Sequence, residues 1–254
     1  MNPPEPAAQM DQRGTMGQRL RAYAVHVYTA SGVALAFLAA LEMTTAQPDA
    51  RYIFILLFGT VFIDATDGPL ARRWEVTRWA ARIDGRTIDD IVDYLTFTFL
   101  PLVLMARMEW LPEPVWLWIV PAMVASLFGF ANREAKDEND GFFLGFPSYW
   151  NIVAFYAGFA QGPTGVWFNA ALVLGLAALT LAPVRFLYPN LAPRPWKAIL
   201  LIGGVAWVAV LFALLATYPA APGWLLAVSL AYPAFYTVLS FWLDRARRSA
   251  ANPR

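Results

Sequence analysis

Four aspartates are grouped in two short segments of the chain, and their spacing suggests that they act together. Asp64 and Asp67 are three residues apart, and Asp89 and Asp93 are four apart. In a helix each pair therefore lies on one face. Both segments border long apolar runs, where carboxylates held close together would repel one another and take up protons unless cations join them. The pattern predicts a metal site.

The available ligand types indicate which metal this would be. The chain has no cysteine, and no histidine lies in either segment, so the ligands are oxygen atoms, which favour Mg²⁺ or Mn²⁺ over Zn²⁺. Two carboxylate pairs on facing helices could hold two such ions, an arrangement that clamps a phosphoryl group during its transfer. Two neighbouring acids, Asp84 and Asp90, are explained equally well as loop charges that neutralise arginines.

The residues around the acids suit a phosphate ester. Gly68 and Ala71 remove side-chain bulk beside the first pair, and Gly85 does so ahead of the second. Arg72 offers a planar, permanently charged group to a phosphate. Further arginines that could receive anionic lipid headgroups are Arg78, Arg82 and Arg86.

The composition is that of a membrane protein. Hydrophobic residues make up 59% of the chain and charged residues only 15%, whereas about a quarter of a soluble domain is charged. The net charge of +1 gives no indication of nucleic-acid binding, and the lack of cysteine excludes a disulfide framework. The polar first residues do not have the pattern of a signal peptide.

We expect an all-α polytopic membrane protein with about eight transmembrane helices, because a span needs roughly 20 apolar residues. The expected spans are 22–46, 51–70, 88–107, 112–131, 147–162, 164–183, 197–217 and 223–243. The fifth is the shortest and could be tilted or partly re-entrant. The expected parts of the chain are a tail at 1–20, a transmembrane domain at 21–244 and a basic tail at 245–254.

The basic residues predict the orientation of these spans. If both termini lie on one side, that side receives all of the 19 Lys and Arg residues except Arg51 and Arg107. By the positive-inside rule this side is the cytoplasm. Both termini and the aspartates are therefore expected to face the cytosol, where Mg²⁺ and nucleotides are found.

The acids and their neighbours read D-x2-D-G-x2-A-R…G-x3-D-x3-D, which resembles the signature of the CDP-alcohol phosphotransferase family. The resemblance implies transfer of a phosphoalcohol or phosphatidyl group from a CDP-linked donor to an acceptor hydroxyl, with release of CMP. It also implies that Asp64, Asp67, Asp89 and Asp93 hold two divalent ions and that Asp93 is the general base. Residues expected to shape the nucleotide and pyrophosphate site are Gly68, Ala71, Arg72 and Gly85. Family resemblance further suggests a homodimer.

The gap from Arg73 to Asp84, twelve residues long, exceeds that of most family members. It resembles the bacterial branch that condenses CDP-diacylglycerol with free choline to give phosphatidylcholine and CMP, in the inner membrane. Three other stretches resemble the same branch: 26–32, 89–94 and 141–151. The resemblance thus extends over most of the chain.

Other residues are weaker candidates for binding the nucleotide or the acceptor. Aromatic faces bind quaternary ammonium groups, which points to Tyr94, Tyr149 and Trp150, although aromatic residues also anchor proteins at bilayer interfaces. Glu134 could offset the charge of choline or be a solvated loop acid. His26 and Thr29, near the start of the first span, could touch the cytidine, and an interfacial hydrogen-bonding role explains His26 equally well.

Two alternatives stay open at this point. The same chemistry could use another acceptor, such as serine, inositol, glycerol phosphate or ethanolamine. A cation-coupled transporter is the second alternative. Transporters commonly bind their substrates near the bilayer midplane in broken helices, whereas these acids lie at one surface beside a basic loop, which favours catalysis.

Overall fold

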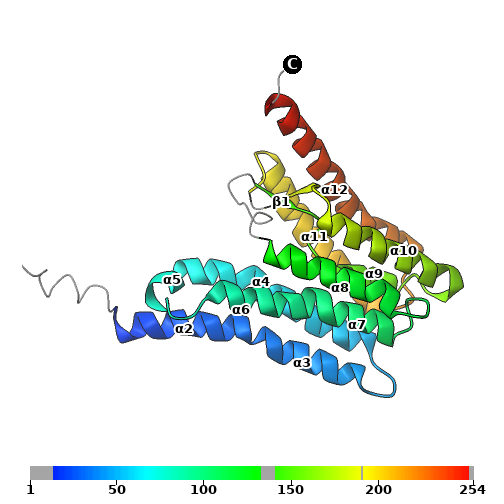
Figure 1. The fold of residues 1–254 in the computed structure, drawn as a ribbon, viewed down its shortest axis with the longest axis horizontal. Coiled ribbons are helices and arrows are strands. Elements are labelled where there is room, and N and C mark those ends of the chain that lie inside the picture. Colours follow the sequence, from blue (N-terminus) through cyan, green and yellow to red (C-terminus); the bar gives the residue numbers. More distant parts are fainter. Residues whose placement is uncertain (1–13, 133–140, 190, 252–254) are drawn as a thin grey trace, which may run out of the picture. The chain divides into compact units, whose positions relative to one another are not determined.

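The computed structural model describes residues 14–132, 141–189 and 191–251, and these are mostly helical (Figure 1). The chain forms two compact units, which meet in the sequence between Thr96 and Phe97. Only the first unit contains the four aspartates of the motif.

The first unit is built from five helices and the start of a sixth. They are α2 (Met16–Ala30), α3 (Gly32–Met43), α4 (Ala50–Arg73), α5 (Val76–Trp79), α6 (Gly85–Asp93) and the π-helix η1 (Tyr94–Phe99). The Thr15 side chain caps α2, and Asp49 caps α4, because both accept hydrogen bonds from backbone N–H groups of the first turn. Helix α2 packs against α4, α5 and α6 and therefore connects these three helices.

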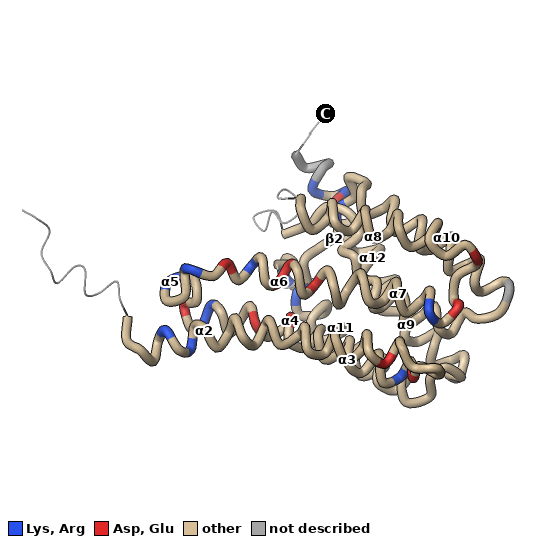
Figure 2. The backbone as a smooth tube through the Cα atoms, turned by 60° about the horizontal axis from the view of Figure 1, so that its bottom comes forward, with Lys and Arg blue, Asp and Glu red and all other residues tan. Residues whose placement is uncertain are grey.

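The short helix α5 folds back onto α2. Glu75, with φ of 48°, turns the chain between α4 and α5. A cluster of buried apolar side chains then joins α5 to α2, and its members are Ala22, Val25, Val76, Trp79 and Ala80. In the same unit, Figure 2 shows charged residues near α5 and near the turn between α3 and α4, with an uncharged length of α3 between them. This is the pattern expected of helices that cross a bilayer.

The second unit contains six helices and a small sheet. Its elements are α7 (Leu100–Arg107), α8 (Trp116–Ala131), β1 (Phe142–Leu144), α9 (Trp150–Ala157), α10 (Gly162–Leu181), β2 (Arg185–Leu187), α11 (Trp196–Thr217) and α12 (Gly223–Ala251). Strands β1 and β2 pair antiparallel, with Phe143 opposite Phe186. They pack on α11 and α12 through Phe142, Leu187, Leu200 and Leu239. The sequence analysis did not anticipate this sheet, because each strand is only three residues long.

The helices support a multi-pass membrane protein. Among the described residues, five helices are long and apolar enough to cross a membrane: 16–43, 50–73, 164–181, 196–217 and 223–247. Helix α8 is apolar but shorter, and α9, in the fifth expected span, has eight residues. Large apolar side chains such as Phe37, Phe62 and Ile202 are exposed, as lipid-facing residues are. The expected number of eight spans and the orientation of the termini stay predictions.

Candidate metal centre

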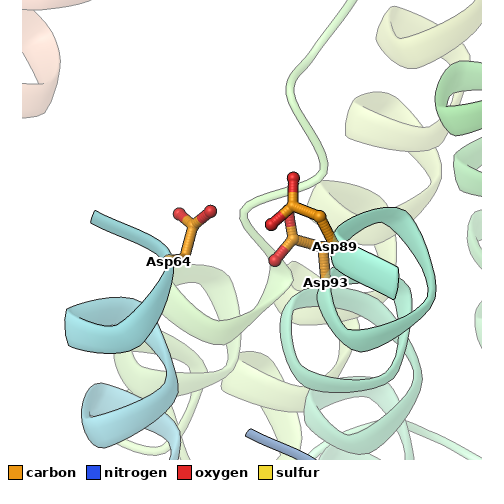
Figure 3. A group of neighbouring side chains, drawn as sticks. All are labelled: Asp64, Asp89 and Asp93. Carbon is orange, nitrogen blue, oxygen red and sulfur yellow. The ribbon is translucent and has the colours of Figure 1, made fainter. Parts of the chain in front are cut away.

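Three of the four aspartates come together from two helices. Asp64 on α4 and Asp89 and Asp93 on α6 each offer one carboxylate oxygen, and these oxygens all lie within 4.8 Å of one another. Figure 3 shows the Asp64 carboxylate facing the other two across the space between the helices. All three residues are half-buried. The i,i+4 spacing of Asp89 and Asp93 places them on one face of α6, as the sequence predicted.

Three carboxylates at this separation fit a hard divalent cation. Three like charges this close repel one another, and a bound cation would offset that repulsion. Carboxylate oxygens converging from two rigid helices are the ligands that Mg²⁺ and Mn²⁺ take. The arrangement therefore agrees with a metal centre, and the donor atoms do not discriminate between the two ions.

Asp67 lies one turn along α4 from Asp64 and is held by α2. The residue is 7% exposed, and its carboxylate accepts a hydrogen bond from the Thr29 hydroxyl, with an Oγ1–Oδ2 distance of 2.8 Å. Next to it, the Tyr28 hydroxyl and Thr66 Oγ1 are 2.7 Å apart. These two contacts fasten α2 to α4 beside the acids. They bring Thr29 into the site, and they orient Asp67 without placing it in the group of three.

The motif suggests that Gly85 leaves space for the substrate, but in the structure a side chain of the protein lies beside it. A Cβ atom on Gly85 would lie 2.8 Å from Cε1 of His26 and 3.1 Å from its Nδ1. The space left by the missing side chain is therefore filled by the imidazole ring. By contrast, a Cβ on Gly68 would meet only the Arg72 guanidinium, at 3.5 Å. Ala71 is half-buried against the cluster that joins α5 to α2.

Asp84 and Asp90 have structural partners. Asp84 caps α6, since its carboxylate accepts hydrogen bonds from the backbone N–H of Arg86 at 3.1 Å and from the Thr87 hydroxyl at 2.7 Å. The bond from Thr87 is the main reason that the pKa of Asp84 is lowered. Asp90 pairs with Arg86, whose Nε lies 3.9 Å from Oδ2. Asp90 thus has the arginine partner expected of a neutralising charge, whereas Asp84 is a helix cap.

The aromatic candidates differ in how they are buried. Trp150 is fully buried in the second unit, and its indole N–H donates to Ser126 Oγ at 2.8 Å. Tyr149 is 44% exposed, and its ring centroid lies 6.2 Å from that of Phe97. Tyr94 is half-buried at the start of η1, directly after Asp93. Glu134 lies outside the described residues. Trp150 therefore has a core environment, whereas both tyrosines keep exposed surface.

Sequence reasoning did not find the contact between His26 and Gly85 or the bond between Thr29 and Asp67. In each pair the residues come from helices far apart in the chain, and no spacing rule links them. The only available signal was that both polar residues lie one turn apart on α2. That signal identified the face of α2 that carries His26 and Thr29, but it did not identify the residues that this face contacts.

The fold and the acidic centre are those of a multi-pass membrane protein with a candidate metal site, and comparison with known proteins identifies its family. The chain is 41% identical to the phosphatidylcholine synthase of Pseudomonas aeruginosa over 67% of its length and 70% of that protein. It is 33% identical to that of Legionella pneumophila over 90% of both chains, and 36% identical to that of Bradyrhizobium diazoefficiens over 73% and 68%. No protein-family profile and no solved structure matches the chain. The protein belongs to the phosphatidylcholine synthase family, and it is a phosphatidyltransferase of the CDP-alcohol type.

Proposed function

We propose that the protein condenses CDP-diacylglycerol with choline, which yields phosphatidylcholine and CMP. One observation carries the proposal: Asp64, Asp89 and Asp93 converge within 4.8 Å in a chain whose relatives are named phosphatidylcholine synthases. The names of the relatives support phosphatidylcholine as the product. The three acids support a metal-assisted transfer of the phosphatidyl group.

The residues of the first unit would act on both substrates. Asp93 would take the proton of the choline hydroxyl, and that oxygen would then attack the phosphorus attached to diacylglycerol. The bond from this phosphorus to the bridging oxygen breaks, and CMP leaves. Two divalent ions, Mg²⁺ or Mn²⁺, held by Asp64, Asp67, Asp89 and Asp93, would neutralise the negative charge of the pyrophosphate. Thr29 would keep the Asp67 carboxylate in one orientation.

The motif residues outside the acids would bind the rest of the donor. Arg72 is exposed beside Gly68, on the same helix as Asp64, so its guanidinium can pair with a phosphate. Gly68 and Ala71 would give the donor close access to the backbone of α4. Gly85, which has no side chain, would leave room for the His26 ring at the start of α6.

For the acceptor, Tyr94 and Tyr149 are our candidates, because each ring has exposed surface to offer to a quaternary ammonium group. Replacing either tyrosine with Leu should raise the KM for choline and leave the KM for CDP-diacylglycerol unchanged. We make no such proposal for Trp150, since it is buried and its N–H is already used.

We further propose that the protein lies in the bacterial inner membrane with the acids facing the cytosol. The distribution of Lys and Arg supports this orientation. The division into an N-terminal tail, a transmembrane domain at 21–244 and a basic C-terminal tail is part of the same proposal, as is a homodimer.

The test is release of CMP by the purified protein with CDP-diacylglycerol and Mn²⁺, with choline, serine, inositol or glycerol phosphate supplied in parallel. Release with choline alone is expected. Asp93→Asn should lower the rate by about 10²- to 10⁴-fold, the usual contribution of a general base. Asp90→Asn is the matched control, because Asp90 lies on the same helix and pairs with Arg86.

Other outcomes would assign the protein differently. Release with another acceptor would keep the metal centre and refute choline as the substrate. If folded protein released no CMP with any acceptor, the phosphatidyltransferase proposal would fail, and cation uptake into vesicles would then test the transporter alternative.

A further inference from the structure

His26 carries a buried polar atom that the protein leaves unused. It is the only histidine of the chain, it is 6% exposed, and its Nε2 has no hydrogen-bond partner among the residues that the structure describes. A buried nitrogen without a partner destabilises the folded protein, because it has lost its hydrogen bonds to water and gained none in return. Such an atom needs an explanation, and one explanation is a bond that forms only when a ligand is present.

The surroundings of His26 place its ring beside the start of α6, the helix that carries Asp89 and Asp93. The ring packs on Gly85, the first residue of α6, so that Cε1 and Nδ1 are its atoms nearest to the glycine. Tyr23 covers the ring from the side, with ring centroids 6.3 Å apart. One turn further along α2, Thr29 donates its hydrogen bond to Asp67. His26 and Thr29 therefore lie on one face of α2, next to the two helices that carry the acids.

The position of His26 along α2 indicates which part of the donor could reach it. His26 is nearer than Thr29 to the end of α2 that carries Arg19 and Arg21, and no charged residue follows Arg21 until Glu42 in α3. If the pyrophosphate of CDP-diacylglycerol lies at the acids, its lipid chains must extend towards the uncharged part of the helices. The nucleoside must then extend towards the charged end, where His26 lies.

We propose that Nε2 of His26 forms a hydrogen bond with the nucleoside of the CDP-linked donor, either with the base edge or with a ribose hydroxyl, and that His26 thereby sets nucleotide specificity. The inference rests on the proposed function. It assigns His26 a binding role and Gly85 the role of making room for the imidazole ring.

The test measures binding of radiolabelled CMP to the full-length protein in lipid nanodiscs with Mn²⁺. His26→Leu removes the polar atom at similar volume, whereas His26→Gln restores a polar group about as far from the backbone as Nε2. We expect His26→Leu to weaken CMP binding by about three- to tenfold, the value of one hydrogen bond, and His26→Gln to recover most of it. The KM for CDP-diacylglycerol should rise with the loss of CMP affinity, and the KM for choline should not.

Thermal stability separates binding from a structural role. Because His26→Leu removes a buried atom without a partner, its melting temperature should equal or exceed that of the natural protein. Tyr218→Phe is the matched control, since it removes a buried hydroxyl from the second unit and should leave CMP affinity unchanged.

Competing nucleotides identify the partner group. If the base is the partner, His26→Leu should reduce the ratio of the affinities for CMP and UMP. If a ribose hydroxyl is the partner, His26→Leu should instead reduce the ratio of the affinities for CMP and 2′-deoxy-CMP. Unchanged CMP affinity in His26→Leu would overturn the inference while choline-dependent CMP release by the natural protein still stood. Loss of affinity that Gln does not recover, together with a lowered melting temperature, would also overturn it. Absence of CMP release by the natural protein would instead refute the proposed function.

Discussion

Buried polar side chains are used differently around Asn169 and around Asp67. In the second unit, Asn169 is 1% exposed, and its amide nitrogen donates to the carbonyl oxygens of Trp110, Ala157 and Ala160 at 3.0–3.2 Å. In the first unit, Asp67 accepts one hydrogen bond from Thr29, and the neighbouring trio of carboxylates gathers negative charge in one place.

The difference separates stability from function. An amide nitrogen that bonds several backbone carbonyls joins segments of the protein and has no N–H donor left for a ligand. A group of carboxylates whose charges repel one another is costly in the folded protein and becomes favourable when a cation binds. We therefore expect substitutions around Asn169 to lower stability, and substitutions around Asp67 to lower metal affinity and catalysis.

The largest expected effect is that of removing the metal. Chelation with EDTA should abolish CMP release, and added Mn²⁺ should restore it. Asp64→Asn removes one charge from the trio, and it should raise the Mn²⁺ concentration needed for half-maximal activity by at least about a hundredfold, the upper end of what even indirect ligand partners contribute. A metal titration of CMP release measures this. An unchanged Mn²⁺ requirement would show that the trio holds no catalytic ion.

The next effect sharpens the role of Asp67. Thr29→Val keeps the shape of the side chain and removes the donor to Asp67, so Mn²⁺ affinity and rate should fall by about ten- to a hundredfold. The matched control is Thr60→Val, because Thr60 is buried on α4 and its hydroxyl donates to the Leu57 carbonyl of its own helix. If Thr29→Val and Thr60→Val needed the same Mn²⁺ concentration for half-maximal activity, Thr29 would not orient Asp67.

A double-mutant cycle tests why residue 85 is glycine. Gly85→Ala should lower activity by about five- to a hundredfold, because overpacking by one methyl group costs about 1–3 kcal/mol and the new Cβ would lie 2.8 Å from the His26 ring. In a His26→Ala background the same change should add almost nothing. If it costs as much in both backgrounds, Gly85 makes room for the substrate and not for His26.

In the second unit, Asn169→Ala should destabilise the protein without changing its catalytic constants. Leaving buried carbonyl groups without a donor costs about 1–3 kcal/mol, so the melting temperature should fall while the KM values and the Mn²⁺ requirement stay the same. Thermal unfolding in detergent and the CMP assay below the melting temperature measure both quantities. A changed Mn²⁺ requirement would show that the two regions are coupled.

The smallest effect concerns the cap of α6. The pKa of Asp84 lies below the usual value for an aspartate, chiefly because its carboxylate accepts a hydrogen bond from the Thr87 hydroxyl. A lowered pKa in the folded state means that the ionised carboxylate stabilises the fold above the unfolded pKa, and that this contribution is lost as the pH falls through the folded pKa. Asp84→Ala should therefore lower the melting temperature slightly at pH 6 and have almost no effect at pH 2.5. An equal effect at both values would show that the ionised cap is unimportant.

The sequence by itself determined which residues could do chemistry and the family to which they belong. Helical periodicity placed Asp89 and Asp93 on one face, because that relationship depends only on residues within a turn of each other. The apolar runs indicated a multi-pass membrane protein, since span length depends on local composition. The 12-residue gap after Arg72 and the motif itself pointed to the family that the relatives confirm.

Only the tertiary structure decided how these residues are grouped. It joined Asp64 to Asp89 and Asp93, bonded Asp67 to Thr29, and filled the space at Gly85 with His26. It also buried Trp150 and paired Phe143 with Phe186 in a sheet. Each of these contacts joins residues far apart in the chain, so it depends on how whole helices pack and not on local spacing. The residue types could be read from the sequence, whereas their partners were set by packing.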